Sequence, residues 1–306
     1  MVFRIPTSRP RPGRSGGASA AFRFWVRGGV TEPQDDSNFG PLRKTRLRVA
    51  SWNLWGRWGP WEERQEPIRK TLARIDADVI GLQEVWAEDE RTQASVLADT
   101  WGFHSTYGSR LPFPDFHLGI GIVSRWPIVG SEERPLPDAG EPDERRLVLR
   151  ADIDGPRGPL QVFTTHLNWR FDHSHVRVAQ IQAIAQFIAE SPERSYPPIL
   201  CGDLNATPDS EEIRMLTGKA KVASPGLVFH DAWDVAGDGT SGFTWDNANP
   251  FAARDLEPNR RIDYVLAGWP KEGGAGQIVG ARVDATEPAD GIHPSDHAAI
   301  VAELRY

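Results

Sequence analysis

Cysteine is almost absent from this chain of 306 residues, which contains a single one, Cys201. No disulfide can therefore form within the chain, and a chain of this length needs none to bury a core. Because Cys201 lies inside an apolar run, we expect a small, buried apolar side chain. No apolar run is long enough to cross a bilayer, so we expect no stable membrane span. The zinc-binding motif His-Glu-x-x-His is also missing.

Acidic residues are missing from the first 31 positions, where six arginines are mixed with proline, glycine and serine. This composition cannot bury a core and is typical of disorder. We therefore predict a disordered tail over residues 1–45 and one domain over residues 46–306. An arginine-rich, acid-poor leader also resembles an organelle transit peptide, and the alternative is a leader without function. We expect a cytoplasmic monomer, with a targeting peptide as the alternative reading of the tail.

The chain also lacks a basic stripe. Its formal net charge is −7 and its pI is about 5.7, which argues against broad electrostatic capture of nucleic acid. This balance still allows a local basic rim around an acidic, metal-loaded site.

Short apolar runs bounded by turn-forming residues predict buried strands, and several of these runs end in a polar side chain. The clearest is Ile199-Leu-Cys-Gly-Asp-Leu-Asn205, in which Asp203 and Asn205 point the same way if the chain is extended. An isolated Asp-x-Asn more often forms an Asx-turn, but here other strands end in complementary groups. The predicted strands cover 47–53, 78–84, 118–124, 147–153, 160–165, 199–205, 261–266 and 298–304. The predicted helices cover 62–75, 92–99, 176–189 and 208–216, and a loop is predicted over 132–144.

The polar residues at these strand ends form one chemical set. Carboxylates and carboxamides are the hard oxygen ligands that suit Mg²⁺ or Mn²⁺, and Glu84 with Asn53 fits such a site. The remaining groups supply what phosphoester hydrolysis needs, namely a base for water, donors to phosphoryl oxygens and a histidine paired with a carboxylate. The set is Asn53, Glu84, His166, Asp203, Asn205, Asp263, Asp296 and His297.

Six short motifs carry a family resemblance that spans residues 47–306. One of them alone would be weak, but all six occur in the order typical of the endonuclease/exonuclease/phosphatase superfamily of metal-dependent phosphoesterases. The chain is therefore identified as resembling that superfamily. The motifs are Ser51-Trp-Asn53, Leu82-Gln-Glu84, Thr165-His166, Gly202-Asp-Leu-Asn205, Arg261-Ile-Asp263 and Ser295-Asp-His297.

The resemblance implies an α/β (α+β) four-layer sandwich, in which two packed mixed β-sheets are flanked by helices. It implies that Glu84, Asn53 and Asp296 hold the metal, Mg²⁺ or Mn²⁺. It also implies catalytic roles for the rest: Asp203 orients or activates the attacking water, Asn205 contacts the phosphate, His297 paired with Asp263 stabilises developing charge, and His166 binds a phosphate oxygen.

The substrate prediction leans towards the neutral sphingomyelinase-like branch. The strings Glu84-Val-Trp86, Arg177-Val-Ala-Gln180 and Asn249-Pro-Phe251 resemble it, although similar strings recur in bacterial members of unknown substrate. Aromatic residues in the flanking loops could stack a base or clasp a lipid head group, with ordinary packing as the equal alternative. The residues predicted to bind substrate are Trp58, Arg170, His173 and Trp245.

Three functions remain open at this point. The first is a phosphodiesterase acting on a lipid head group or small phosphodiester, and the second is a nuclease acting on DNA or RNA. The third is a catalytically inactive binding module, which is disfavoured because no predicted ligand or base is missing. Two features depart from the deoxyribonuclease pattern: disulfides are absent, and the tyrosine–acid pair of some relatives has only Tyr107 and Asp115 as candidates.

Overall fold

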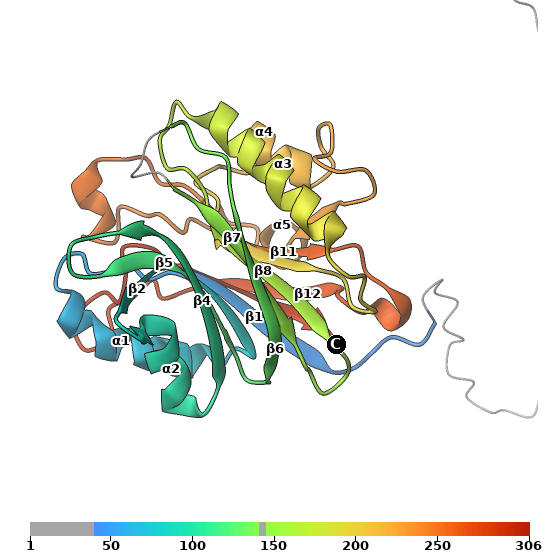
Figure 1. Ribbon diagram of the computed structural model, residues 1–306, viewed down its shortest axis with the longest axis horizontal. Helices are drawn as coiled ribbons and strands as arrows, with labels where there is room; N and C mark the ends of the chain where they lie inside the picture. Colours follow the sequence, from blue (N-terminus) through green and yellow to red (C-terminus); the bar gives the residue numbers. More distant parts are fainter. Residues whose placement is uncertain (1–39, 141–144) are drawn as a thin grey trace, which may run out of the picture. The chain divides into compact units, whose positions relative to one another are not determined.

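Two mixed β-sheets pack face to face in the computed structural model, which describes residues 40–140 and 145–306 (Figure 1). The predicted tail lies outside the described residues up to position 39. One sheet has the strand order β12-β13-β1-β2-β5-β4, with β3 beside β2, and the other has the order β10-β11-β9-β8-β7-β6. The strands are β1 Arg46–Asn53, β2 Val79–Glu88, β3 Arg91–Thr92, β4 His104–Pro112, β5 His117–Ser124, β6 Ile128–Pro135, β7 Leu147–Ile153, β8 Leu160–His166, β9 Ile199–Asp203, β10 Phe229–Asp231, β11 Asp263–Gly268, β12 Ile278–Asp284 and β13 Ala299–Arg305.

Apolar side chains from both inner faces fill the space between the sheets, among them Val79, Ile122, Val162 and Val265. The sheets approach closely at Gly81, where an added Cβ would lie 2.6 Å from the Cβ of Cys201. Glycine is therefore needed at position 81. The prediction for Cys201 is confirmed, because the side chain is fully buried and burial raises its pKa to about 12.

Helices cover the outer face of each sheet, so the predicted four-layer sandwich is confirmed (Figure 1). The stripe of Ile68, Leu72 and Ile75 on one helix packs on the first sheet, as its periodicity predicts. The helices are α1 Trp61–Ile75, α2 Gln93–Trp101, α3 Ser174–Glu190, α4 Glu211–Leu216 and α5 Ala232–Ala236, with short 3₁₀ turns at Ala252–Asp255 and Glu272–Gly274. None of the described helices is long and apolar enough to cross a membrane.

Three element predictions were wrong in part. The first residues of the loop predicted over 132–144 belong instead to β6, which lies at the edge of its sheet. Its charged side chains are largely exposed to solvent, as is common in edge strands. The helix predicted to open at Pro208 begins instead at Glu211 after Ser210, because residues 207–210 form a turn closed by the Ser210 N–H and the Thr207 carbonyl. The strand predicted to end at Glu84 continues to Glu88 through a bulge.

Two of the strand pairs are parallel, and each is joined by a helix. These β–α–β units are β1–α1–β2 and β8–α3–β9, with Asn53 beside Gln83 in the first and His166 beside Asp203 in the second. Parallel strands point their carboxyl ends towards the same edge of a sheet. The two units therefore deliver the ends of four strands to one region.

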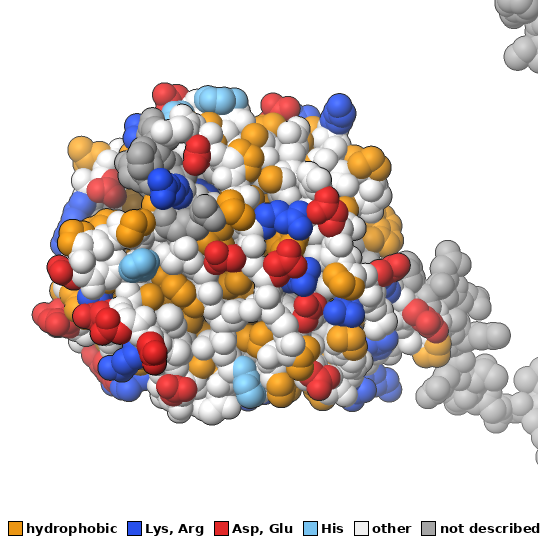
Figure 2. Space-filling view, in the orientation of Figure 1, with side chains coloured by type: hydrophobic (Ala, Val, Ile, Leu, Met, Phe, Trp, Pro, Cys, Tyr) orange, Lys and Arg blue, Asp and Glu red, His pale blue; other side chains and the backbone are white. Residues whose placement is uncertain are grey.

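Charged side chains of both signs are interspersed on the face of the molecule drawn in Figure 2. On the face drawn in Figure 2, blue lysine and arginine side chains alternate with red acidic ones. The described residues on that face form no continuous basic stripe, in keeping with the negative net charge.

Candidate active site

A cleft of about 480 Å³ opens at the strand ends. It brings together most of the predicted site residues, although they are separated by more than 200 positions in the chain. Asn53 and Asp263 do not line it and lie behind it, bonded to residues that do. The lining consists of Trp55, Trp58, Glu84, Arg146, His166, Trp169, Asp203, Asn205, Trp245, Asp255, Glu257, Arg260, Ile262, Asp296 and His297.

In the second sheet, Asp203 stands between two other predicted residues in register. His166 on β8 is its partner on the parallel side, and Asp263 on β11 is its partner on the antiparallel side. The Nε2 atom of His166 lies 3.4 Å from Oδ2 of Asp203. The other oxygen of Asp203 accepts a hydrogen bond of 3.0 Å from the backbone N–H of Asn205, which has φ of 48°. Such left-handed backbone in a non-glycine residue is a local strain found at functional sites.

His297 reaches this group from the segment before β13. Its Nδ1 lies 2.9 Å from Oδ2 of Asp263, and its Nε2 lies 3.7 Å from Oδ2 of Asp203. Burial alone would lower the pKa of His297, but the Asp263 and Asp203 carboxylates outweigh it and hold the pKa well above its ordinary value. His297 is therefore favoured as an imidazolium.

The pKa values of two residues near His297, His166 and Asp203, are shifted in opposite directions. Burial, together with the positive charges of Arg146 and His297, holds the pKa of His166 well below its ordinary value. Burial and the nearby Asp263 raise the pKa of Asp203 to about 7. A neutral histidine and a carboxylate that can accept a proton near neutral pH thus lie side by side.

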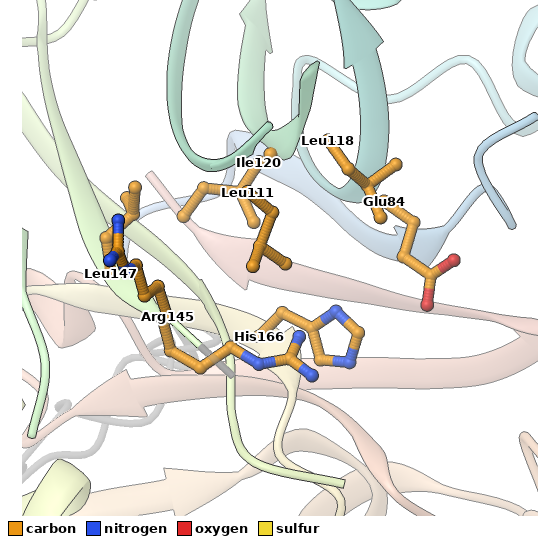
Figure 3. Close-up of a pocket in the computed structure, with 9 residues that line it drawn as sticks. Glu84, Leu111, Leu118, Ile120, Arg145, Leu147 and His166 are labelled. Atoms are coloured by element: carbon orange, nitrogen blue, oxygen red, sulfur yellow. The ribbon is translucent and has the colours of Figure 1, made fainter. Parts of the chain in front are cut away.

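In the first sheet, Glu84 is turned into the cleft by a bulge. Its φ is 52°, and the pairing of β2 with β5 shifts register between Gln83 and Val85. A bulge re-aims a side chain in this way at many active sites. Figure 3 shows Glu84 from β2 and His166 from β8 beside a small hollow of about 30 Å³, with Leu111, Leu118 and Ile120 next to them.

Asn53 connects the two sheets. Its Nδ2 donates to Oε1 of Glu84 at 3.2 Å and to Oδ2 of Asp203 at 3.1 Å. Its Oδ1 accepts the backbone N–H of Trp55 at 2.9 Å, and because an N–H can only donate, this contact fixes which amide atom faces the acids. Asn53 therefore holds both carboxylates by donated hydrogen bonds.

Asp296 completes the acidic side of the cleft. Its Oδ1 lies 3.2 Å from the Ser295 hydroxyl, which donates to the backbone carbonyl of Asn53 at 2.7 Å. Burial and the nearby Glu84 raise the pKa of Asp296 to about 7. The half-buried Glu84 and the buried Asp296 both line the cleft, and carboxylate oxygens of this kind suit a divalent cation.

The four residues predicted to bind substrate divide into two pairs. Trp58 and Trp245 line the cleft, Trp58 with 39% of its surface exposed and Trp245 almost fully buried. Arg170 and His173 do not line it. The carbonyl of Arg170 accepts a hydrogen bond from Arg177 of α3. The ring of His173, the residue just before α3, packs edge-to-face on His175 in the first turn of that helix.

Sequence reasoning missed three arginines at or beside the cleft. Arg146 and Arg260 line it, and they come from segments whose proximity depends on tertiary structure alone. Arg64 lies beneath it and is fully buried. Arg64 could have been found, because it precedes Ile68 and Leu72 by one and two helical steps of four and so places a charge on the apolar stripe of α1.

The chain is similar in sequence to known proteins. The sequence pattern described as the Endonuclease/Exonuclease/phosphatase family matches residues 50–297. Sphingomyelin phosphodiesterase 2 of Homo sapiens is 25% identical over 300 residues, which cover 86% of this chain and 66% of that protein. The inositol phosphosphingolipids phospholipase C of Schizosaccharomyces pombe is 28% identical over 210 residues, which cover 61% of this chain and 46% of that protein.

Solved structures agree on the fold. The crystal structure of D. rerio TDP2 complexed with single strand DNA product matches with a TM-score of 0.68 at 23% sequence identity, and the match covers 86% of this chain and 100% of that chain. The chain spans 46% to 66% of the length of the two sequence relatives named above. With the family pattern covering most of the described residues, the chain belongs to the Endonuclease/Exonuclease/phosphatase family.

Proposed function

We propose that this chain is a metal-dependent phosphodiesterase, which uses water to break a P–O bond in a lipid head group or another small phosphodiester. One observation carries the proposal. Polar residues from the ends of separate strands in both sheets meet in one cleft, joined by the hydrogen bonds of Asn53 to Glu84 and Asp203. Packing alone does not require so many buried, mutually repelling acids in one place.

Glu84 and Asp296 would hold the divalent cation, Mg²⁺ or Mn²⁺, and Asn53 would keep Glu84 oriented. The mutual repulsion of the two acids, which contributes to the raised pKa of Asp296, supports a cation between them. When bound, the cation would polarise the phosphoryl group and stabilise its negative charge.

A different group, in the second sheet, has ligand atoms close enough together to hold a metal ion. Ligand atoms of Asp203, Asp263 and His297 lie within 4.8 Å of one another. Both ring nitrogens of His297 face these carboxylates, so a protonated imidazole already balances their charge. We therefore assign the cation to the oxygen-only set.

The second sheet would carry the proton chemistry. Asp203, with its raised pKa, would orient the attacking water and accept its proton. His297, kept in place by Asp263, would donate from Nε2 to a phosphoryl oxygen as negative charge develops. His166 and the amide of Asn205 would supply further donors. Each such group is worth roughly 3–4 kcal/mol of transition-state stabilisation when removed singly.

The relatives favour a sphingolipid-like phosphodiester as substrate, since their names describe enzymes that act on such lipids. A nuclease is the second candidate, favoured by Trp58 and Trp169 at the cleft, where exposed indoles could stack bases. The absence of a basic stripe on the face in Figure 2 weighs against it.

A panel of substrates tests the proposal. The protein would first be stripped of metal with EDTA and dialysed. It would then be assayed for hydrolysis of sphingomyelin, a chromogenic phosphodiester and a phosphomonoester, and for nicking of plasmid DNA. Each assay would be run with and without Mg²⁺ or Mn²⁺. We expect metal-dependent turnover of the chromogenic phosphodiester and of sphingomyelin. Full turnover of every active substrate in excess EDTA would contradict metal dependence, and plasmid nicking without lipid cleavage would favour the nuclease. No turnover of any of them would favour the inactive binding module.

A further inference from the structure

Arg64 on α1 is a fully buried cation whose hydrogen-bond partners are backbone carbonyls. Its NH1 donates to Leu54 at 2.9 Å and to Pro294 at 2.8 Å. Its NH2 donates to the carbonyls of Trp55, Gly56 and Trp58 at 2.8, 3.1 and 3.0 Å. Arg64 forms no ion pair with a carboxylate among the described residues, and its guanidinium carbon lies 4.7 Å from the centroid of the Trp55 ring.

These carbonyls belong to two segments beside the proposed metal site: the one that follows Asn53, which orients Glu84, and the one that leads to Asp296. Leu54 follows Asn53 directly, and Pro294 lies two residues before Asp296. Gly56, whose carbonyl accepts from Arg64, donates its own N–H to the carbonyl of Glu84 at 3.1 Å. One guanidinium is therefore bonded to the backbone one residue after Asn53 and two residues before Asp296, and it is connected through Gly56 to the backbone of Glu84.

A second buried arginine provides the contrast. Arg177 on α3 also donates to loop carbonyls, those of Asn168 and Arg170, but its Nε pairs with the Glu212 carboxylate at 2.9 Å. The charge of Arg177 is thus balanced within its own pair. The charge of Arg64 instead acts on Asp296 and Glu84, which offset part of the lowering of its pKa by burial, to about 10.

We propose that Arg64 is a positioning residue for the divalent cation, fixing the segment after β1 against the segment before β13 so that Glu84 and Asp296 face each other. This inference rests on the proposed function. The five carbonyls are reached by the four N–H groups of the two terminal nitrogens, so one N–H is shared between acceptors, while the Nε of Arg64 has no partner among the described residues. The planar guanidinium holds these donors in fixed directions, which the three rotating donors of a lysine ammonium cannot do.

The charge of Arg64 and its hydrogen bonds have opposite effects on metal affinity, so the variant has to change one and keep the other. A fixed cation near the site opposes binding of a second cation, so loss of charge alone would strengthen metal affinity. Loss of the carbonyl contacts would weaken it. Arg64→Lys keeps the charge and loses most of the geometry, so any weakening it produces reports positioning.

The test measures binding of Mn²⁺ alone to the full chain, by electron paramagnetic resonance of the free ion. We expect Arg64→Lys to weaken Mn²⁺ binding by about 10–100-fold, the usual effect of removing a group that supports metal ligands. The matched control is Arg177→Lys, which removes loop contacts from the other buried arginine and should leave Mn²⁺ affinity within about twofold. Turnover of the chromogenic phosphodiester by Arg64→Lys should recover at high Mn²⁺.

Several results would overturn the inference. Unchanged Mn²⁺ binding by Arg64→Lys would do so, as would equal weakening by both variants, which would indicate general loosening. If Arg64→Lys does not fold, hydrogen exchange of the unaltered chain decides: Mn²⁺ should protect residues 54–58 and 294–297 together, and no protection at 54–58 would refute the inference. Failure of the unaltered chain to bind Mn²⁺ would instead overturn the proposed function itself.

Discussion

The two β–α–β units of this protein have the same plan but bring different chemistry to the cleft. In β1–α1–β2, the strands end in Asn53 and turn at Glu84, and the crossover helix carries Arg64. In β8–α3–β9, the strands end in His166 and Asp203, and the crossover helix carries Arg177. In each unit a buried arginine bonds to the carbonyls of the loop that follows the first strand.

The two units differ in whether their charged side chains have oppositely charged partners. In the second unit the charged groups have bonded or nearby counter-charges: Arg177 is paired with Glu212 of α4, and Asp203 lies 3.7 Å from the His297 ring, which comes from the segment before β13. In the first unit, Glu84 lines the cleft together with Asp296 and has no ion pair with a described cationic side chain, because Arg64 bonds only to carbonyls. This difference supports our proposal that one half of the cleft binds a cation and that the other half transfers a proton.

The largest expected effect comes from the first unit. Glu84→Gln keeps the shape of the side chain and removes its charge, so turnover of a chromogenic phosphodiester at low Mn²⁺ should fall by roughly 10²–10³-fold. The assay is steady-state hydrolysis across a series of Mn²⁺ concentrations. Part of the loss should be recovered at high Mn²⁺. If Glu84→Gln turned over at low Mn²⁺ as fast as the unaltered chain, Glu84 would not be a metal ligand.

The proton half is tested by Asp203→Asn. An amide cannot accept the proton of the attacking water, so the turnover number should fall by roughly 10²-fold and should not recover at high Mn²⁺. Recovery of full turnover by added Mn²⁺ would show that Asp203 acts as a metal ligand and that the two halves do not divide the chemistry. Thermal unfolding of both variants controls for loss of fold.

A smaller effect is expected at the rim of the cleft. Trp58 is 39% exposed and packs edge-to-face on Phe113, so Trp58→Ala should leave folding intact. Stacking on an aromatic ring is worth about 1–3 kcal/mol, which predicts a KM for the true substrate raised several-fold to over a hundred-fold. Hydrolysis of a small chromogenic phosphodiester should hardly change.

The control for Trp58 is Trp269→Ala. Trp269 is 63% exposed but does not line the cleft, so KM should stay the same for both substrates. Equal losses on the large and the small substrate in Trp58→Ala, or a large drop in its melting temperature, would mean that Trp58 serves packing.

The smallest effect is expected from the tail. Deletion of residues 1–39 should leave hydrolysis and the melting temperature unchanged. Deletion through Thr45 should lower the melting temperature by a few degrees, because the Arg43 N–H donates to Gly273 and Arg305 donates to the Arg43 carbonyl, each bond contributing about 1 kcal/mol. If deletion of residues 1–39 abolished folding, the predicted domain boundary would be wrong.

The sequence predicts the strand ends well because local pattern decides them. Asn53, His166 and Asp203 each close an apolar run that has to be buried, so their place at a sheet edge follows from the run itself. The bulge at Glu84 is not visible in the same way, since Leu-Gln-Glu-Val-Trp gives no sign of the positive φ that turns the acid into the cleft. Edge strands β4, β6 and β12 are also missed, because pairing with a neighbour, rather than an apolar pattern, stabilises them.

Contacts between distant segments account for the rest of what the sequence hides. Asp263 lies beside Asp203 because of the antiparallel register of β11 and β9. No local sequence pattern predicts that register. Arg146 and Arg260 reach the cleft through tertiary packing, and Arg64 was overlooked although its place on an apolar stripe marked it as unusual.

The division of the cleft into a metal half and a proton half is tested most directly by Mn²⁺ affinity, measured by electron paramagnetic resonance on the unaltered chain, Glu84→Gln and Asp203→Asn side by side. The account predicts that Glu84→Gln binds Mn²⁺ at least about tenfold more weakly, while Asp203→Asn stays within a few-fold of the unaltered chain. The reverse order would contradict it, and would place the cation in the Asp203, Asp263 and His297 group instead.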